Sequence, residues 1–172
     1  MHPDAVCVFI GPCIAKKSEV IDSITFGGAD YAMTYEELAS MFEAKNIDPE
    51  ECTETMQQGS KFGKQYSVSG GVTAAVLETF KEANKEVDLK VKTCSGAQEC
   101  KKALMLLKVG KLPADFVEGM ACVGGCVGGP SKHKTELEAK KARDLLIGQA
   151  DDREVHANLK NLGVDQVAMH RH

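Results

Sequence analysis

The fold is decided around the stretch Met120-Ala121-Cys122-Val123-Gly124-Gly125-Cys126-Val127-Gly128-Gly129-Pro130. Four glycines surround two thiols that stand four residues apart, and the stretch contains no charged side chain. Glycine is unfavourable inside helices and strands, so the run predicts backbone that turns sharply and approaches another group closely. Cysteines presented in this way are typical of a metal ion or an iron–sulfur cluster. The alternative is a flexible glycine loop with two incidental thiols.

Both flanks of the expected site start from short apolar strands. Residues 5–10 are continuously apolar and lie between Pro3-Asp4 and Gly11-Pro12, which predicts a strand buried on both faces of a parallel sheet, with Cys7 packing as a small hydrophobe. Cys13 and Lys16 follow that strand, where ligands of open α/β sheets are found. A strand over residues 114–120 leads into the cysteine loop in the same way. We therefore expect Cys13, Cys122 and Cys126 to meet at one edge of a sheet.

The rest of the chain alternates between helical and extended patterns. Thr34 and Glu37 form a capping-box signal for a helix to about residue 45. A Gly-Gly turn opens a second helix that ends near residue 84, and further helices are expected over residues 97–109, 132–146 and 151–163. Their apolar anchors are expected to be Ala97, Leu104, Leu107, Leu137, Leu145 and Leu146. Residues 87–93 predict a strand, while residues 20–30 and 50–65 read as loops, the latter with one turn of helix. The predicted fold is a single α/β domain over residues 1–172. It has a small, mostly parallel sheet with flanking helices, a core over about residues 5–145 and a charged helical tail over 146–172.

Composition limits the class of protein. The chain has 172 residues, of which 43% are hydrophobic and 27% charged, as in an ordinary soluble domain. No apolar run is long enough to span a bilayer and no signal peptide opens the chain, so we expect a cytoplasmic protein without a membrane partner. The net charge of −4 and the lack of a basic stripe argue against nucleic acid.

The seven cysteines do not predict a disulfide framework, because their number is odd and the cytosol keeps thiols reduced. Cys52 is expected to be exposed and incidental, and Cys94 and Cys100 to be structural. The histidines His133, His156, His170 and His172 are expected to be solvated.

The thiol spacing favours a cluster over a zinc ion. Structural zinc sites usually show two close pairs of ligands, whereas Cys13, Cys122 and Cys126 are irregularly spaced. A [4Fe–4S] cube takes four thiolates, so a fourth ligand would have to come from elsewhere.

Two motifs carry a resemblance to a known family. Residues 11–19, Gly-Pro-Cys-Ile-Ala-Lys-Lys-Ser-Glu, and residues 118–130, from Glu-Gly-Met-Ala-Cys to Gly-Gly-Pro, resemble two of the three signature motifs of the iron-only ([FeFe]) hydrogenase catalytic domain. Ser-Gly-Gly-Val at 69–72 resembles a family segment that lies between them. The resemblance covers about residues 5–145, implies one lobe of that catalytic domain, and implies reversible conversion of H₂ to protons and electrons.

The resemblance also implies a cofactor, the H-cluster, which is a [4Fe–4S] cube joined to a two-iron subsite with CO, cyanide and a dithiolate. By motif position, Cys13, Cys122 and Cys126 would ligate the cube, and Cys126 would bridge to the two-iron subsite. Lys16 would donate to a cyanide, which suits an ammonium facing an anion. Met120 would pack beside the subsite as a soft, apolar wall.

Further residues are placed against the cofactor by the same resemblance. Tyr66, where the family usually has Phe, and Val72 would line the subsite pocket. The complete set of expected cofactor contacts is Gly11, Pro12, Tyr66, Gly70, Gly71, Val72 and Ala121.

The chain departs from the family pattern in three respects. The family's first cysteine motif, which supplies the fourth cube ligand, is absent; Gly11 stands where hydrogen-evolving members carry Met; and no ferredoxin-like segment is present. We therefore expect a fragment or split subunit that is inactive alone. Its partners would be an upstream segment or second subunit with the fourth cysteine, and an electron carrier such as ferredoxin or a signalling domain. The alternatives are an H₂-sensing module or cluster scaffold without turnover, and a plain α/β domain with spare thiols.

Overall fold

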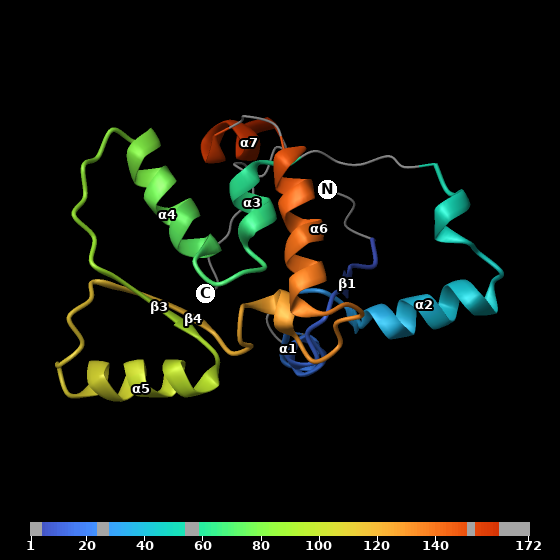
Figure 1. Cartoon of the computed structure of the whole chain (residues 1–172), viewed down its shortest axis with the longest axis horizontal. Coiled ribbons are helices and arrows are strands. Elements are labelled where there is room, and N and C mark those ends of the chain that lie inside the picture. The colour runs from blue at the N-terminus through green and yellow to red at the C-terminus, as the bar shows by residue number, and fades with distance from the viewer. Residues whose placement is uncertain (1–4, 24–27, 54–58, 151–153, 162–172) are drawn as a thin grey trace.

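The computed structural model describes residues 5–23, 28–53, 59–150 and 154–161. Short strands alternate with helices along the chain (Figure 1). In chain order the elements are β1 (Val8–Ile10), α1 (Ala15–Ser23), β2 (Tyr31–Met33), α2 (Tyr35–Ala44), η1 (Pro49–Glu51), α3 (Lys61–Gln65), α4 (Gly71–Glu82), β3 (Val91–Ser95), α5 (Ala97–Lys108), β4 (Phe116–Met120), η2 (Cys126–Gly128), α6 (Glu136–Gly148) and α7 (Val155–Asn161).

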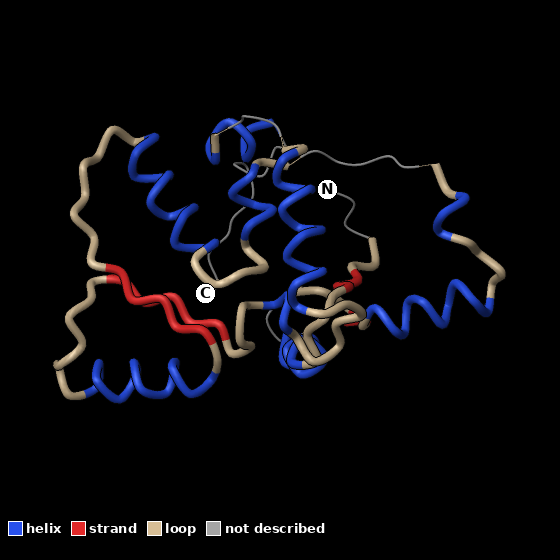
Figure 2. The backbone as a smooth tube through the Cα atoms, viewed as in Figure 1, coloured by secondary structure: helices blue, strands red, loops and turns tan. Residues whose placement is uncertain are grey.

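The strands in the described part of the chain form two separate parallel pairs. β1 pairs with β2 from Val8 opposite Tyr31, and β3 pairs with β4 from Val91 opposite Phe116. Each pair is joined by a helix, α1 or α5, so each is a strand–helix–strand unit of the kind that parallel pairing requires (Figure 2). The predicted α/β class with small parallel sheets is confirmed. The expectation that the strands before Cys13 and before the cysteine loop share one sheet is wrong, because each pairs with its own neighbour in the chain.

The helices connect the two units. α5 packs on β3 and β4, and α4 lies on the opposite side of that pair (Figure 1). α6 runs through the middle of the molecule, where it packs against α3 and η2, and α7 packs against α4. The cysteine loop after β4 is thereby brought towards the loop after β1.

The predicted capping signal of α2 is confirmed, whereas the sequence analysis did not predict α1 and β2. Thr34 caps α2 through a capping box, in which Glu37 N–H donates to Thr34 Oγ1 at 3.3 Å. α1 overlaps the predicted loop over 20–30, and β2 follows it directly. Neither element was predicted, because α1 has no clear apolar face and β2 has only three residues. β3 lies a few residues later than predicted. Among the described residues, no helix is both long and apolar enough to cross a bilayer.

The prediction that large apolar side chains form the core is wrong. The buried hydrophobic residues in the described part of the chain are small, namely Ala75, Cys94 and Ala103. All six predicted apolar anchors of α5 and α6 are exposed; Leu104, for example, is 61% exposed. Val8 and Ile10 of β1 are exposed as well, and so is Cys7, because no element among the described residues covers them.

Candidate metal centre

The first wall of the site is the turn after β1. Gly11 is buried and its N–H donates to Met33 O at 3.1 Å, which holds the turn against the end of β2. Pro12 and the half-buried Cys13 follow directly, just before α1 begins. The thiol of Cys13 therefore stands at the carboxyl end of β1, as the sequence predicted.

The second wall is the cysteine loop after β4, and backbone contacts fix it. Gly124 and Gly125 have φ values of +81° and +97°, in the region that favours glycine. Gly124 N–H donates to Ser95 Oγ at 2.8 Å, while Gly124 O accepts from Ser69 N–H at 3.3 Å. A Cβ on Gly125 would lie 2.6 Å from Ser67 O. The glycines are therefore needed for the loop to lie against residues 67–69.

The two walls touch each other. Ser131 N–H donates to Pro12 O at 3.2 Å, and a Cβ on Gly129 would lie 2.5 Å from the same carbonyl oxygen. Segments from opposite ends of the chain thus meet through backbone contacts, and they bring Cys13 to the cysteine loop.

The three predicted ligands are close enough to interact electrostatically. Burial raises the pKa of the Cys126 thiol, the neighbouring thiols Cys13 and Cys122 raise it further, and Lys16 acts in the opposite direction. All three thiols are half-buried. Within the described ranges, no three His, Cys, Asp or Glu side chains are placed to hold one metal ion.

The donor set fits three corners of an iron–sulfur cube, which takes its ligands as thiolates. A buried hydroxyl oxygen, Ser69 Oγ, has no hydrogen-bond partner in the described structure, and the N–H of the same residue bonds the cysteine loop. An unsatisfied buried hydroxyl is costly, and an acceptor beside the loop, such as a cluster sulfur, would satisfy it.

Lys16 lies in the first turn of α1 beside Phe9. Its ammonium pairs with the carboxylate of Glu19 and stands 5.6 Å from the centre of the Phe9 ring. Its interaction with Cys126 places its charge near the thiols. Donation to a cyanide ligand stays a prediction for this residue.

The other predicted contacts have varied settings. Gly70 caps α4 with a φ of +92°, and a Cβ on Gly71 would lie 1.9 Å from Gln65 O, so both positions require glycine. Val72 and Met120 are half-buried. Tyr66 is 48% exposed at the end of α3, and Ala121 is exposed. Contact of these residues with a cofactor stays a prediction.

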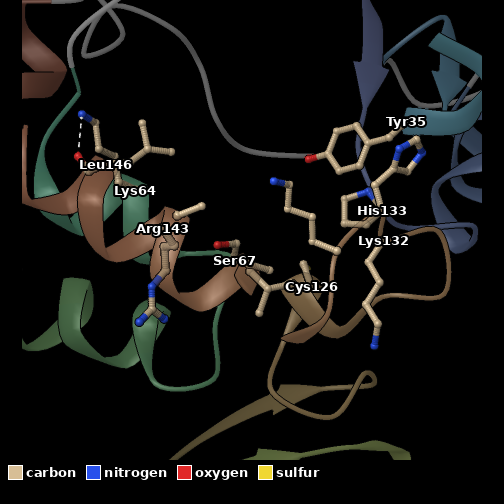
Figure 3. A pocket seen from close by; sticks show the side chains of 13 residues that line it. Tyr35, Lys64, Ser67, Cys126, Lys132, His133, Arg143 and Leu146 are labelled. Atoms are coloured by element: carbon tan, nitrogen blue, oxygen red, sulfur yellow. Dashed lines mark hydrogen bonds between the residues drawn. The ribbon is translucent and has the colours of Figure 1, made fainter. Parts of the chain in front are cut away.

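A cavity of about 450 Å³ adjoins the cysteine loop. Its wall includes Cys126, Ser67 and the basic residues Lys132 and Arg143, and in Figure 3 Ser67 and Cys126 lie between the two basic residues. His133 also lines it and makes an edge contact with Tyr35. Cys126, the bridging cysteine of the prediction, therefore lines a cavity whose wall also carries basic side chains.

The remaining cysteines and histidines lie in other settings. Cys52 is exposed, as predicted, whereas Cys94 is fully buried in β3 and burial raises its pKa. The Cys100 thiol points at Met120 O, 3.6 Å away. His156 is solvent-exposed but pairs with Glu82. His170 and His172 lie outside the described residues.

The sequence interpretation missed Glu118. This residue lies in β4 and is 4% exposed. Its carboxylate accepts hydrogen bonds from Gly70 N–H at 2.7 Å and from Thr73 N–H at 2.9 Å. The available signal was a carboxylate in the middle of an apolar strand, since buried acids are rare unless they are paired.

These features match a known domain. The family described as iron only hydrogenase large subunit, C-terminal domain, matches residues 1–130. The chain belongs to this family. The predicted resemblance is thereby confirmed, and the two walls described above carry two of the hydrogenase motifs.

Individual relatives agree with the family. The periplasmic [Fe] hydrogenase large subunit of Nitratidesulfovibrio vulgaris is 32% identical, over 71% of this chain and 37% of its own length. A variant of the [FeFe]-hydrogenase HydA1 from Chlamydomonas reinhardtii has the same fold, with a TM-score of 0.66 at 21% identity, over 94% of this chain and 58% of that one. An [FeFe]-hydrogenase structure on stepwise H-cluster assembly gives a TM-score of 0.64 at 21% identity over the same shares.

The chain therefore spans 37% of the curated hydrogenase relative that it matches. The relative's name places that protein in the periplasm, and the compartment of this chain stays a prediction.

Proposed function

We propose that this chain forms part of the H-cluster pocket of an iron-only hydrogenase catalytic domain, and that the full-length parent interconverts H₂ with protons and electrons. The observation that carries the proposal is the convergence of Cys13 with Cys122 and Cys126. The turn after β1 and the loop after β4 bond each other through Pro12 and Ser131. Burial raises the pKa of Cys126, and the neighbouring thiols of Cys13 and Cys122 raise it further.

The cysteines would hold the cluster. Cys13, Cys122 and Cys126 would each give a thiolate to the cube, with Cys126 as the bridge to the two-iron subsite. A bound H-cluster would supply the redox chemistry of H₂. Because the Cys126 pKa is raised, this thiol must lose its proton on binding, and nearby Lys16 favours the thiolate. The fourth thiolate is proposed to come from another part of the parent protein or from a second subunit, and electrons from a carrier such as ferredoxin.

Other residues would orient and enclose the cofactor. Lys16 would exchange its carboxylate partner Glu19 for an anionic ligand of the subsite, holding its proton at Nζ. Met120 and Val72, both half-buried, would exclude water with apolar surface. Gly70 and Gly71 would allow the backbone to approach closely at the start of α4.

A second candidate function is H₂ sensing or cluster scaffolding without turnover, and the setting of Gly11 favours it. Gly11 stands where hydrogen-evolving members carry Met. A Cβ at this position would lie 3.0 Å from two atoms of the Phe9 ring. The Phe9 ring therefore fills space that a larger side chain would need, and the subsite would have one fewer contact.

The test uses the full-length protein, matured anaerobically, with iron analysis and infrared spectroscopy. We expect bound iron together with bands of CO and cyanide. Cys122→Ser and Cys126→Ser should each abolish cluster retention, whereas Cys52→Ser, at an exposed site, should leave it unchanged. Equal sensitivity of Cys52 would refute the ligand assignment. No iron–sulfur cluster and no CO or cyanide bands in the wild type would refute the function.

The rate of H₂ uptake separates the two candidates. Brisk turnover by the matured protein indicates an enzyme, whereas detectable but very slow turnover indicates a sensor. A protein that retains the cube without CO and cyanide bands would be a scaffold.

A further inference from the structure

The start of α4 depends on a side chain from another element. Gly70 is the N-cap residue of α4 and has no side chain to accept from the first turn of the helix; Gly71 N–H donates to Val68 O at 3.1 Å, but Thr73 N–H has no acceptor from the N-cap residue. Thr73 N–H, which an N-cap side chain would normally satisfy, is buried. The helix therefore begins at a point that its own sequence leaves uncapped.

Glu118 supplies the missing cap from β4. One carboxylate oxygen accepts from Gly70 N–H at 2.7 Å. The other accepts from Thr73 N–H at 2.9 Å and from the Thr73 hydroxyl. A carboxylate at a helix N-terminus also interacts favourably with the helix dipole. Three donors from α4 thus converge on one buried side chain, 45 or more residues away in the chain.

The two segments that Glu118 joins by hydrogen bonds, β4 and the start of α4, both border the candidate site. Glu118 stands two residues before Met120 in β4, which leads into the cysteine loop, and Gly70 stands two residues before Val72 of the predicted subsite pocket. A second link runs in parallel, since Ser69 N–H donates to Gly124 O at 3.3 Å. Residues 67–73 and 118–127 are therefore joined by hydrogen bonds at several points along their length.

We infer that Glu118 is a positioning residue, which fixes the start of α4 against the cysteine loop and thereby sets the geometry of the two-iron subsite. The inference rests on the proposed function. Glu118 would not touch the cofactor itself and acts through Gly70 and Thr73. The cube, held by thiolates, depends on it less than the subsite does.

The matched control is Glu82, at the other end of α4. Its side chain is 4% exposed, and it caps α7 by accepting from His156 N–H at 2.9 Å. Glu118→Gln and Glu82→Gln each replace one acceptor oxygen by an amide NH₂ that faces a donor. They perturb stability in the same way at opposite ends of one helix.

The first experiment records infrared and electron paramagnetic resonance spectra of both variants in the full-length, matured protein. Glu118→Gln should shift or broaden the CO and cyanide bands and keep the cube signal, and Glu82→Gln should leave both unchanged. Unchanged bands in Glu118→Gln, or equal changes in the two variants, would overturn the inference.

The second experiment measures amide hydrogen exchange and does not depend on the cluster. Glu118→Gln should accelerate exchange by roughly tenfold or more at Gly70 and Thr73, and also across residues 122–127, as loss of a charged hydrogen bond implies. Acceleration confined to Gly70 and Thr73 would overturn the inference. If the wild type shows no CO or cyanide bands, the proposed function fails and this experiment decides the role of Glu118 alone.

A milder variant keeps the inference testable if Glu118→Gln does not fold. Thr73→Val removes only the hydroxyl donor and keeps the carboxylate and its two backbone partners. It should produce smaller changes in the same bands and the same amides. No change in either would overturn the inference.

Discussion

Replacing Gly125 by alanine tests whether the cysteine loop is held by its backbone contacts. Gly125 has a φ of +97°, which costs an L-residue roughly 1–2 kcal/mol. The added Cβ would also lie 2.6 Å from Ser67 O and from Val68 Cα. These are backbone atoms that cannot turn aside, and such overpacking costs about 1–3 kcal/mol. The sum is a destabilisation of roughly 2–5 kcal/mol.

Two other glycines separate the contributions. Gly110 has a φ of +66° but open space around its Cβ position, so Gly110→Ala should lose only the conformational part, about 1–2 kcal/mol. Gly148 ends α6 with an ordinary φ and open space. Gly148→Ala should therefore stabilise the protein by up to about 0.5–1 kcal/mol.

The assay is urea unfolding of the three variants, combined with measurement of bound iron after anaerobic maturation. We expect the order of stability to be Gly148→Ala, wild type, Gly110→Ala and then Gly125→Ala, with iron lost only in Gly125→Ala. If Gly125→Ala were no less stable than Gly110→Ala, the packing of the loop against residues 67–69 would be refuted. If it were destabilised but kept all its iron, the loop would not be positioning the thiols.

Three further predictions concern stability and thiol chemistry. Burial opposes ionisation of Glu82, but hydrogen bonds from His156 and Val155 outweigh this effect and lower the pKa of Glu82. The contribution of Glu82 to the free energy of unfolding should therefore be present above its pKa in the unfolded state, and it should vanish as the pH falls through its pKa in the folded state. Measurements of the free energy of unfolding from pH 7 to pH 3 should show this loss in the wild type. If the free energy of unfolding of Glu82→Gln depended on pH with the same slope, the prediction would be contradicted. Thr34→Ala should cost about 1 kcal/mol because it removes the cap of α2, and Thr34→Ser should restore most of that stability; equal losses would count against the capping box. A thiol reagent should modify Cys52 within the mixing time and leave Cys94, fully buried with a raised pKa, unmodified until the protein unfolds; early labelling of Cys94, read by mass spectrometry, would show that β3 opens.

Much of this protein could be predicted from local signals. The capping box at Thr34 and Glu37 fixed the start of α2, because both partners lie within one helical turn. The Gly-Gly pair at 70–71 marked the start of α4, and the glycines around Cys122 and Cys126 marked a loop with unusual φ values. The two cysteine motifs indicated the family, since their residue types and spacing are properties of the chain itself.

The sequence by itself thus determined the α/β class, the motif-bearing turns and the family. Only the tertiary structure decided which strands pair, that Pro12 meets Ser131, and that Glu118 caps a helix whose N-cap residue, Gly70, lies 48 residues earlier in the chain. It also decided that Leu104 and Cys7, apolar by type, lie exposed. The physical reason is range: caps and turns depend on neighbours within a few residues, whereas burial and pairing depend on which distant segment covers each face.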